Sequence, residues 1–295
     1  MIVLTAGGFD ARISLAGGTL TRLHWQSGDR VVPLLRDAAD DADAGHSACF
    51  PLVPFGNRVR DNVFSFGGRT HRLQPNTQGD RHYLHGDGWL GRWDIVRAEP
   101  QGVELGFSQG ESRGTPYRYT AHQSFAIEPG AFRLSLAVTN TSEMPLPFGL
   151  GWHPFFSLTP ETTLQATVDW VRGEEAEWLP GERIARPADL DFAKAEKLPC
   201  RWINNGLESW DGRARIAWPE RGAGLTLEAD ALFRHAVLFV SDERFEPAYR
   251  HDYFCFEPMS HLADGHHLPD LGGLSVLPPG ETLSGSLLLR PELLA

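Results

Sequence analysis

Phe132-Arg-Leu-Ser-Leu-Ala-Val-Thr139 is the stretch that decides the fold class of this chain. Its even-numbered positions are apolar and its odd-numbered positions are polar or small, which is the period of a β-strand with one buried face. Glu128-Pro-Gly-Ala131 comes just before it and indicates a hairpin turn from the run Tyr119 to Glu128. The stretch therefore predicts a pair of antiparallel strands.

Strand and turn patterns of the same kind continue along the chain. A second hairpin is expected from Ala214–Trp218, through a turn containing proline and glycine, to Leu225–Glu228. The apolar runs 236–240 and 286–289 have the length of buried strands, although periodicity alone does not distinguish them from helix fragments. Residues 172–200 are polar and turn-rich, which indicates a long excursion between strands.

No linker, repeat or low-complexity tract divides the chain. Its 31 glycines and 21 prolines are spread along the whole length, and helical spacing is rarely sustained. All-β domains often exceed the usual domain size as one unit. The sequence therefore predicts an all-β protein in which residues 1–295 form a single domain, a large antiparallel β-sandwich with few short helices.

Composition narrows the class of protein. The net charge of −11, from 27 basic and 38 acidic residues, argues against binding to nucleic acid. No apolar run approaches the roughly 20 residues that cross a bilayer, and the start of the chain lacks the pattern of a signal peptide. Cys49, Cys200 and Cys255 leave an odd cysteine count, which indicates a reducing compartment, the cytoplasm by default. Edge strands that could pair leave the oligomeric state open.

Two titratable residues stand in strongly apolar surroundings. His153 lies within Phe148-Gly-Leu-Gly-Trp-His-Pro-Phe-Phe156, and Glu257 follows Tyr253-Phe-Cys-Phe256. A charge in such a place loses hydration, and chains tolerate this mainly where a shifted pKa is useful. A hydrogen-bonded core histidine and an ion-paired glutamate explain either residue alone equally well. The two together, with the motifs that follow, favour chemistry.

Two further motifs carry residues suited to sugar hydroxyls. Phe50-Pro-Leu-Val-Pro-Phe-Gly-Asn-Arg-Val59 places Arg58 after Asn57 in an apolar loop, where the guanidinium could hold hydroxyls or a ring oxygen. Tyr83-Leu-His-Gly86 places His85 before Trp89 and Trp93, and indole faces stack on sugar rings. A surface salt bridge and a loop histidine beside core tryptophans are the structural alternatives.

Taken in order, these motifs resemble the aldose 1-epimerase (galactose mutarotase) family over most of the chain. The resemblance implies a large twisted β-sandwich whose wide cleft binds one sugar. It implies that Glu257 is the general base and His153 the general acid, that Arg58 and His85 contact the sugar, and that Asn57 lies beside Arg58. Where the family usually has a sugar-binding aspartate, this chain has Asn204-Asn205, and Asn205 is expected to bind hydroxyls without a charge. We also expect His261 to line the cleft, because it follows Glu257 on the same segment.

The expected chemistry needs only protonic groups. Interconverting anomers breaks the bond between C1 and the ring oxygen while a base takes a proton from the C1 hydroxyl and an acid protonates the ring oxygen. We therefore expect His153 and Glu257 to face each other across a gap the size of a pyranose ring. No cofactor or metal is predicted, because the crowded His251, His261, His266 and His267 lack the spacing of a zinc site.

The favoured function is therefore a free-aldose isomerase, with a neutral sugar such as glucose or galactose as its small-molecule partner. A hexose-6-phosphate 1-epimerase would need a cationic pocket, for which Arg72, Arg81 and Arg113 are available. A glycoside hydrolase would need a second carboxylate besides Glu257, and the candidates are Asp87, Asp211 and Asp264. A carbohydrate-binding protein without catalysis is the third alternative.

Overall fold

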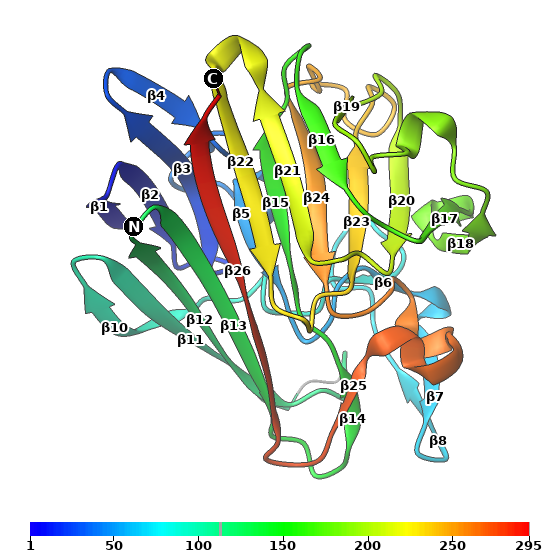
Figure 1. The fold of residues 1–295 in the computed structure, drawn as a ribbon. Coiled ribbons are helices and arrows are strands. Elements are labelled where there is room, and N and C mark those ends of the chain that lie inside the picture. Colours follow the sequence, from blue (N-terminus) through cyan, green and yellow to red (C-terminus); the bar gives the residue numbers. More distant parts are fainter. Residues whose placement is uncertain (112–113, 295) are drawn as a thin grey trace.

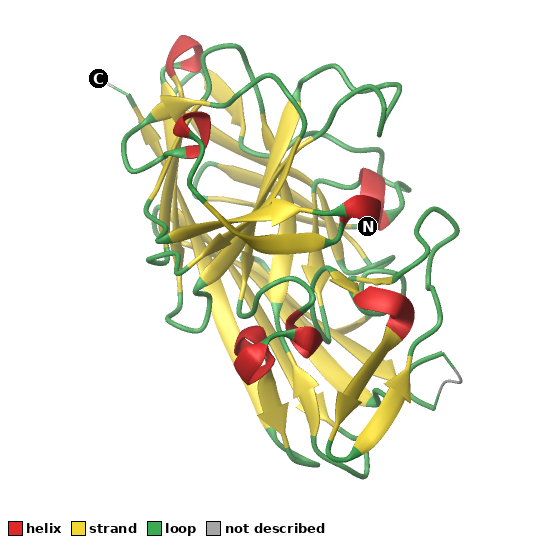
Figure 2. Cartoon of the chain, turned by 90° about the vertical axis from the view of Figure 1, so that its right-hand side faces the viewer, coloured by secondary structure: helices red, strands yellow, loops and turns green. Residues whose placement is uncertain are grey.

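Two large antiparallel sheets pack against each other in the computed structural model, which describes residues 1–111 and 114–294 (Figure 1). Within those residues every helix is a short 3-10 turn, and the longest has five residues. The seven turns are η1 (Ala44–His46), η2 (Arg60–Asn62), η3 (Ala176–Trp178), η4 (Ala188–Leu190), η5 (Pro219–Arg221), η6 (Gly265–His267) and η7 (Pro269–Gly273). They lie between strands or at the edges of the sheets (Figure 2).

The larger sheet has eleven strands in the order β1-β2-β3-β5-β15-β24-β23-β20-β17-β18, and β4 pairs with β3 beside this path. Their bounds are β1 (Ile2–Ala6), β2 (Phe9–Ser14), β3 (Thr19–Ser27), β4 (Arg30–Pro33), β5 (Cys49–Leu52), β15 (Gly151–Ser157), β17 (Trp170–Glu174), β18 (Pro180–Ile184), β20 (Ile203–Glu208), β23 (His235–Val240) and β24 (Tyr253–Met259). The central strands of this sheet, β5, β15 and β24, therefore come from widely separated parts of the chain.

The second sheet has nine strands in the order β10-β11-β12-β13-β26-β22-β21-β16-β19. Their bounds are β10 (Asp94–Glu99), β11 (Gly102–Gln109), β12 (Tyr119–Glu128), β13 (Ala131–Asn140), β16 (Thr163–Ala166), β19 (Glu196–Lys197), β21 (Arg213–Trp218), β22 (Ala223–Ala229) and β26 (Thr282–Leu293). Three small pairs complete the strands: β6 (Arg58–Val59) with β9 (Tyr83–Leu84), β7 (Val63–Phe66) with β8 (Arg69–Arg72), and β14 (Leu146–Phe148) with β25 (Ser275–Leu277).

The observed strands confirm the sequence prediction of a β-sandwich with few short helices. β12 and β13 form the expected hairpin, with Glu128 opposite Ala131, and β21 and β22 form the second. Phe132, Leu134, Leu136 and Val138 on β13 are at most 2% exposed, as their alternation predicts. The prediction that residues 172–200 form a long excursion between strands is partly wrong, because β18 and β19 each add an edge strand to one of the sheets. The single-domain interpretation of residues 1–295 stays a prediction.

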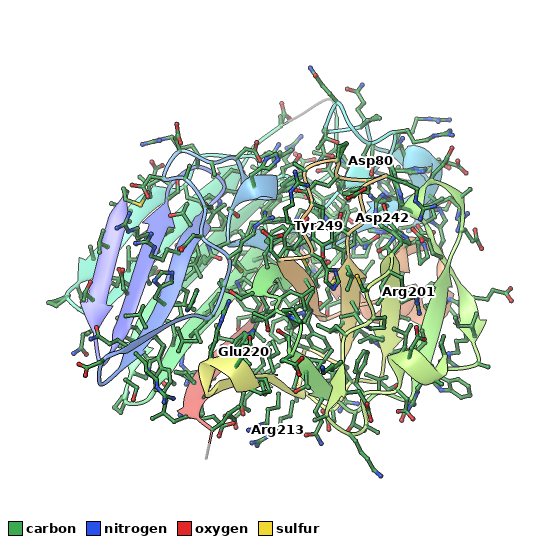
Figure 3. All side chains as sticks on the ribbon, turned by 90° about the horizontal axis from the view of Figure 1, so that it is seen from above. Asp80, Arg201, Arg213, Glu220, Asp242 and Tyr249 are labelled. Carbon is green, nitrogen blue, oxygen red and sulfur yellow. The ribbon has the colours of Figure 1, made fainter. Side chains whose placement is uncertain are left out.

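The central strand β24 is covered on both sides. All seven of its residues are buried, although a strand at the surface of a sandwich would expose every second side chain. One face of the larger sheet packs on the nine-stranded sheet, whereas loops cover the other. Asp80, Tyr249 and Asp242 lie on this loop side, opposite Arg213 of β21 and Glu220 of η5 (Figure 3). No helix within the described residues is long and apolar enough to span a bilayer.

Candidate active site

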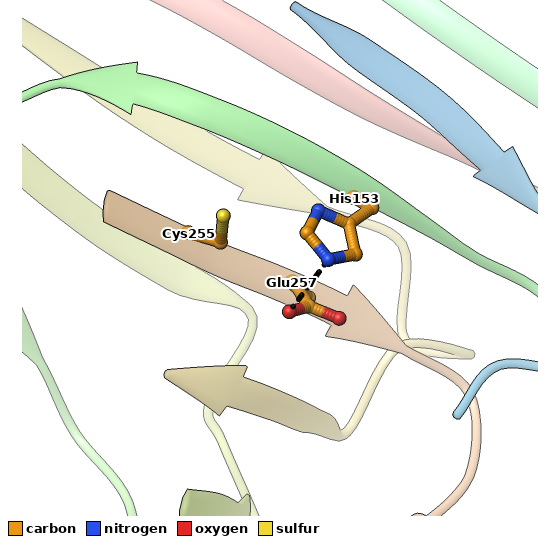
Figure 4. A group of neighbouring side chains, drawn as sticks. All are labelled: His153, Cys255 and Glu257. Atoms are coloured by element: carbon orange, nitrogen blue, oxygen red, sulfur yellow. Dashed lines mark ion pairs between the residues drawn. The ribbon is translucent and has the colours of Figure 1, made fainter. Parts of the chain in front are cut away.

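Strand register brings His153 and Glu257 together on the loop side of β15 and β24. Gly151 pairs with Met259 and Phe155 with Cys255, so His153 lies opposite Glu257 between these pairs. On its other side His153 pairs with Phe50 of β5. Because opposite residues of antiparallel strands share a face of the sheet, Phe50, His153 and Glu257 form a row across three adjacent strands. Figure 4 shows the contact between His153 and Glu257.

The two titratable side chains are in direct contact. Nε2 of His153 lies 3.2 Å from Oε1 of Glu257, and the side chains are 12% and 3% exposed. The Phe50 ring stacks on the imidazole with a centroid separation of 4.5 Å, and the Phe155 ring lies at 4.6 Å. The expectation that a gap the size of a pyranose ring separates the two side chains is therefore wrong. They stand side by side on the floor of one cavity, because neighbouring strands carry them.

Burial decides the protonation of this pair. It raises the pKa of Glu257 to about 8, against a smaller opposing effect of the Arg58 charge. It lowers the pKa of His153 to about 3, and the positive charge of Arg36 adds to this. At neutral pH both shifts favour the uncharged forms, and the 3.2 Å between Nε2 of His153 and Oε1 of Glu257 is short enough for the two groups to share one proton.

Each member of the pair keeps a free polar atom. Within residues 1–111 and 114–294, neither Oε2 of Glu257 nor Nδ1 of His153 has a hydrogen-bond partner. A buried polar atom left in this state costs about 1–3 kcal/mol. Such a cost is expected where a ligand supplies the missing partner.

The pair lies at the base of a cavity of about 330 Å³. This volume is within the roughly 300–1,000 Å³ of small-molecule sites. We call five of its lining residues the floor: Phe50, Trp89, His153, Phe155 and Glu257. We call three further aromatic residues the rim: Trp178, Trp202 and Phe245. Phe239 also lines the cavity. Apolar faces with few polar groups suit a sugar ring, whose hydroxyls point outward and whose C–H faces stack on aromatic rings.

Short loops place two more predicted residues at the cavity. The backbone N–H of Asn57 donates to Nδ1 of His85 over 3.0 Å, which leaves the proton of a neutral His85 ring on Nε2 as a donor. Burial lowers the pKa of His85 well below its usual value, and the neighbouring His153 and Arg58 lower it further. Gly86 has a φ of +72°, and a Cβ there would lie 2.3 Å from the carbonyl oxygen of Val53. The turn therefore requires a glycine at position 86.

Arg58 places a positive charge at the cavity, and its contacts with neighbouring residues fix the position of the side chain. Its Nε donates to Oδ2 of Asp80 over 2.7 Å, and the guanidinium lies 5.4 Å from the ring centroid of Trp178. The Arg58 side chain is 10% exposed and that of Asp80 is 5% exposed. Asp80 in turn accepts from the backbone N–H of His82. The ion pair therefore fixes the direction of the Arg58 side chain.

Comparison with known proteins identifies the family of this chain. The family model for aldose 1-epimerase matches residues 1–290. The uncharacterised protein YphB of Escherichia coli K12 is 40% identical over 290 residues, covering 98% of each chain. A crystal structure of an Escherichia coli K12 protein, provisionally described as an aldose 1-epimerase, has a TM-score of 0.94 at 40% identity and covers 99% of this chain and 98% of that one. The chain belongs to the aldose 1-epimerase family.

The fold of this aldose 1-epimerase family member extends to distant proteins. A galactose mutarotase-like protein from Clostridium acetobutylicum has a TM-score of 0.84 at 18% identity, with 99% of this chain and 95% of that chain covered. The resemblance inferred from the four motifs is therefore confirmed, as is the mutarotase-like sandwich. Membership also supports the coarser prediction of an isomerase that acts on a carbohydrate.

The neighbouring residues Asn204 and Asn205 on β20 lie differently from the prediction. Asn204 pairs with Phe239 and lines the cavity, whereas Asn205 pairs with Leu238 and its amide donates to the backbone oxygen of Arg172. Of the two, Asn204 therefore lines the cavity, and the expectation that Asn205 faces it is wrong. The reason is the period of a strand, since a shift of one residue moves a side chain to the other face.

His261 supports the site without lining the cavity. Its Nε2 accepts from the backbone N–H of Gly56 over 2.9 Å, and its Nδ1 donates to the carbonyl of Leu262 over 2.8 Å. Both ring nitrogens are therefore occupied by the backbone, and the expectation that His261 lines the cleft is wrong. The ring instead holds the loop that carries Asn57 and Arg58. Trp93 is likewise a core residue, whereas Trp89 reaches the cavity.

The residues named for the alternative functions lie elsewhere. Arg72 and Arg81 do not line the cavity, and Arg113 lies outside the described residues. Of the carboxylates considered, Asp87 accepts from the Tyr83 hydroxyl, Asp264 accepts from the Arg60 backbone and pairs with His267, and Asp211 accepts from the Arg213 backbone. None of the three lines the cavity. Sequence reasoning missed a second cavity carboxylate, Glu246, which accepts from the Tyr253 hydroxyl.

One group of side chains in this family member could hold a metal ion. The ligand atoms of His153, Cys255 and Glu257 lie within 4.8 Å of one another. Without a metal ion, burial raises the pKa of the Cys255 thiol well above its usual value, so the thiol stays protonated at neutral pH. The prediction of acid–base chemistry without a metal stays a prediction.

We expect Asp80→Asn to destabilise the protein and to weaken substrate binding. Removing one charge of a buried pair leaves the other uncompensated, which costs roughly 3 kcal/mol. Urea unfolding measures the stability and steady-state kinetics the KM. Asp189→Asn is the control, because Asp189 and Arg201 form an exposed pair with 45% and 44% exposed side chains and such pairs contribute about 0–1 kcal/mol. Equal stability of the two variants would contradict the role of Asp80.

Proposed function

We propose that this protein is a mutarotase that interconverts the α and β anomers of a free aldose. The observation that carries the proposal is the contact between Glu257 and His153 on the floor of a small aromatic cavity. A carboxyl and an imidazole with one exchangeable proton between them are the groups that ring opening requires.

The reaction needs one proton taken from the C1 hydroxyl and one given to the ring oxygen. Transfer of one proton from Oε1 of Glu257 to Nε2 of His153, across the 3.2 Å between them, turns the neutral pair into a carboxylate and an imidazolium without changing its net charge. Glu257 then takes the hydroxyl proton while His153 protonates the ring oxygen, so that the C1–ring oxygen bond breaks and C1=O forms. Rotation about C1–C2 and the reverse steps close the ring on the other face of C1.

Neighbouring groups would orient the sugar. Nε2–H of His85 can donate to a hydroxyl, and the Asn204 side chain offers an amide in the same cavity. The positive charge of Arg58 lowers the pKa of Glu257 against the effect of burial and so stabilises its carboxylate form. The second cavity arginine, Arg36, already donates to the backbone oxygens of Ser47 and Gly45. Both guanidinium groups are thus held by the protein, which favours a neutral sugar over a phosphorylated one.

Polarimetry on freshly dissolved α-anomers tests the proposal. We expect faster mutarotation of at least one neutral aldose, with glucose and galactose tested first. Glucose 6-phosphate and galactose 6-phosphate form the second arm, and a strong preference for them would favour the phosphosugar epimerase. No acceleration of any sugar in the panel would exclude the enzyme and leave a binding protein.

The activity should depend on pH through the single proton of the pair. Because the pKa of Glu257 is raised to about 8, we expect kcat/KM to fall above that pH as the pair loses its proton. Because the pKa of His153 is lowered to about 3, the acid limb should lie well below the usual range of histidine. The measurement is kcat/KM from pH 4 to 9.5, each corrected for the uncatalysed rate. Limbs at the ordinary values of roughly 4.3 and 6.5 would contradict this assignment.

A further inference from the structure

The cavity adjoins a second depression across its aromatic rim. Trp178, Trp202 and Phe245 line both hollows. The Phe245 ring lies 5.3 Å from that of Trp178 and 5.2 Å from that of Trp202 by ring centroids. Phe245 is 44% exposed, so the cluster presents aromatic surface to solvent. Clustered exposed rings continuous with a binding cavity indicate a place where a ligand extends beyond the cavity.

The polar groups of the second depression are largely neutralised. Glu175 pairs with Arg60, Glu177 with Arg81 and Asp242 with Arg244. Glu174 accepts from the Trp202 indole N–H over 2.6 Å and from the Asn204 amide over 2.9 Å. The surface therefore combines aromatic faces with hydrogen-bonding groups and little unpaired charge. This chemistry suits a neutral sugar ring better than an ionic ligand.

The reaction sets how a sugar must sit in the cavity. C1 and the ring oxygen have to meet Glu257 and His153 on the floor, as the proposed function requires. In a pyranose, C4 lies opposite C1 and C3 lies opposite the ring oxygen, so the C3–C4 edge points away from the floor. A substituent on that edge leaves the cavity toward the rim, whereas C6 is bonded to C5, next to the ring oxygen.

We infer that the rim formed by Trp178, Trp202 and Phe245 is a subsite for a second sugar residue. The aldose that enters the cavity is then the reducing end of a 1→4-linked disaccharide or longer saccharide. The second ring stacks on the exposed aromatic faces, and its hydroxyls meet the polar groups beyond them. This inference deepens the proposed function and rests on it for the orientation of the sugar.

Calorimetric titration tests the subsite by binding. The probes are glucose, the 1→4-linked cellobiose and maltose, and the 1→6-linked gentiobiose. We expect at least one 1→4-linked disaccharide to bind about tenfold more tightly than glucose, as one added stacking contact allows, and gentiobiose to gain nothing. Phe245→Ala and Trp202→Ala should each remove most of the gain.

Trp170→Ala is the matched control. Trp170 is 48% exposed, close to the exposure of Phe245, but it lies on β17, its ring meets Arg183 of β18, and it lines neither hollow. The variant should keep the ratio of disaccharide to glucose affinity, and circular dichroism should show native folding of all three variants. Equal affinities for glucose and both 1→4-linked disaccharides, or no detectable binding of any probe, would overturn the subsite. A ratio unchanged in both rim variants would do the same.

Mutarotation rates separate this result from the proposed function. Tight disaccharide binding that depends on the rim, without faster mutarotation of any sugar, supports the subsite and refutes the mutarotase. Faster mutarotation of glucose with no gain in affinity for 1→4-linked disaccharides supports the mutarotase and overturns the subsite.

Discussion

Glu257→Gln should lower kcat/KM for mutarotation by about 10² or more. Glutamine keeps the shape of the side chain, and its amide can still donate to Nε2 of His153. It cannot exchange a proton with the C1 hydroxyl, so the loss should appear in kcat while sugar binding persists. Polarimetry gives the rate and calorimetric titration gives the affinity. Unchanged kinetics together with normal binding would remove Glu257 from the chemistry.

Glu246→Gln is the matched control, since Glu246 is the other carboxylate at the cavity and accepts from the Tyr253 hydroxyl. We expect it to reduce kcat/KM by less than about tenfold, because this role needs no proton transfer. An equal loss in both variants would instead favour a mechanism with two carboxylates, as in glycoside hydrolysis.

Unfolding measurements show whether a loss of activity reflects a loss of structure. The raised pKa of Glu257 means that the folded state retains a proton that the unfolded state releases as the pH passes its ordinary value. This contribution to stability is therefore complete in acid and declines as the pH rises to about 8. Glutamine does not titrate, so Glu257→Gln should become more stable relative to the wild type over that interval.

The features of this protein that depend on neighbouring residues can be predicted from the sequence. The alternation from Phe132 to Val138 predicts a strand with one buried face, and β13 has that face. An ionisable group within a run of aromatic residues indicates a shifted pKa, and burial shifts the pKa values of both His153 and Glu257. In both cases the cause lies in residues next to one another in the chain.

Contacts between residues on strands that are far apart in the chain cannot be predicted from neighbouring residues in this way. His153 and Glu257 touch because β15 pairs with β24 in one particular register, and pairing is set by the packing of the whole sheet. The same limit explains Asn205, since only the register of β20 with β23 tells which asparagine faces the cavity. Trp178, Trp202 and Phe245 come from three separate segments, so their meeting at the rim has no local signal.

His153→Asn should likewise lower kcat by about 10² or more. Asparagine fits between the rings of Phe50 and Phe155 and can accept a hydrogen bond from the Glu257 carboxyl. It has no proton to give to the ring oxygen, so ring opening would rely on water. Polarimetry over a range of sugar concentrations separates kcat from KM.

The control for this change is the other imidazole at the cavity. His85 is held as a neutral donor by the Asn57 backbone, so His85→Asn should raise KM more than it lowers kcat. Stability in acid gives a readout independent of turnover. Because the pKa of His153 is lowered to about 3, the unfolded state takes up a proton first and stability falls as the pH drops below about 6.5. His153→Asn lacks this loss, and a wild-type acid sensitivity in the variant would mean that the imidazole is not buried in its neutral form.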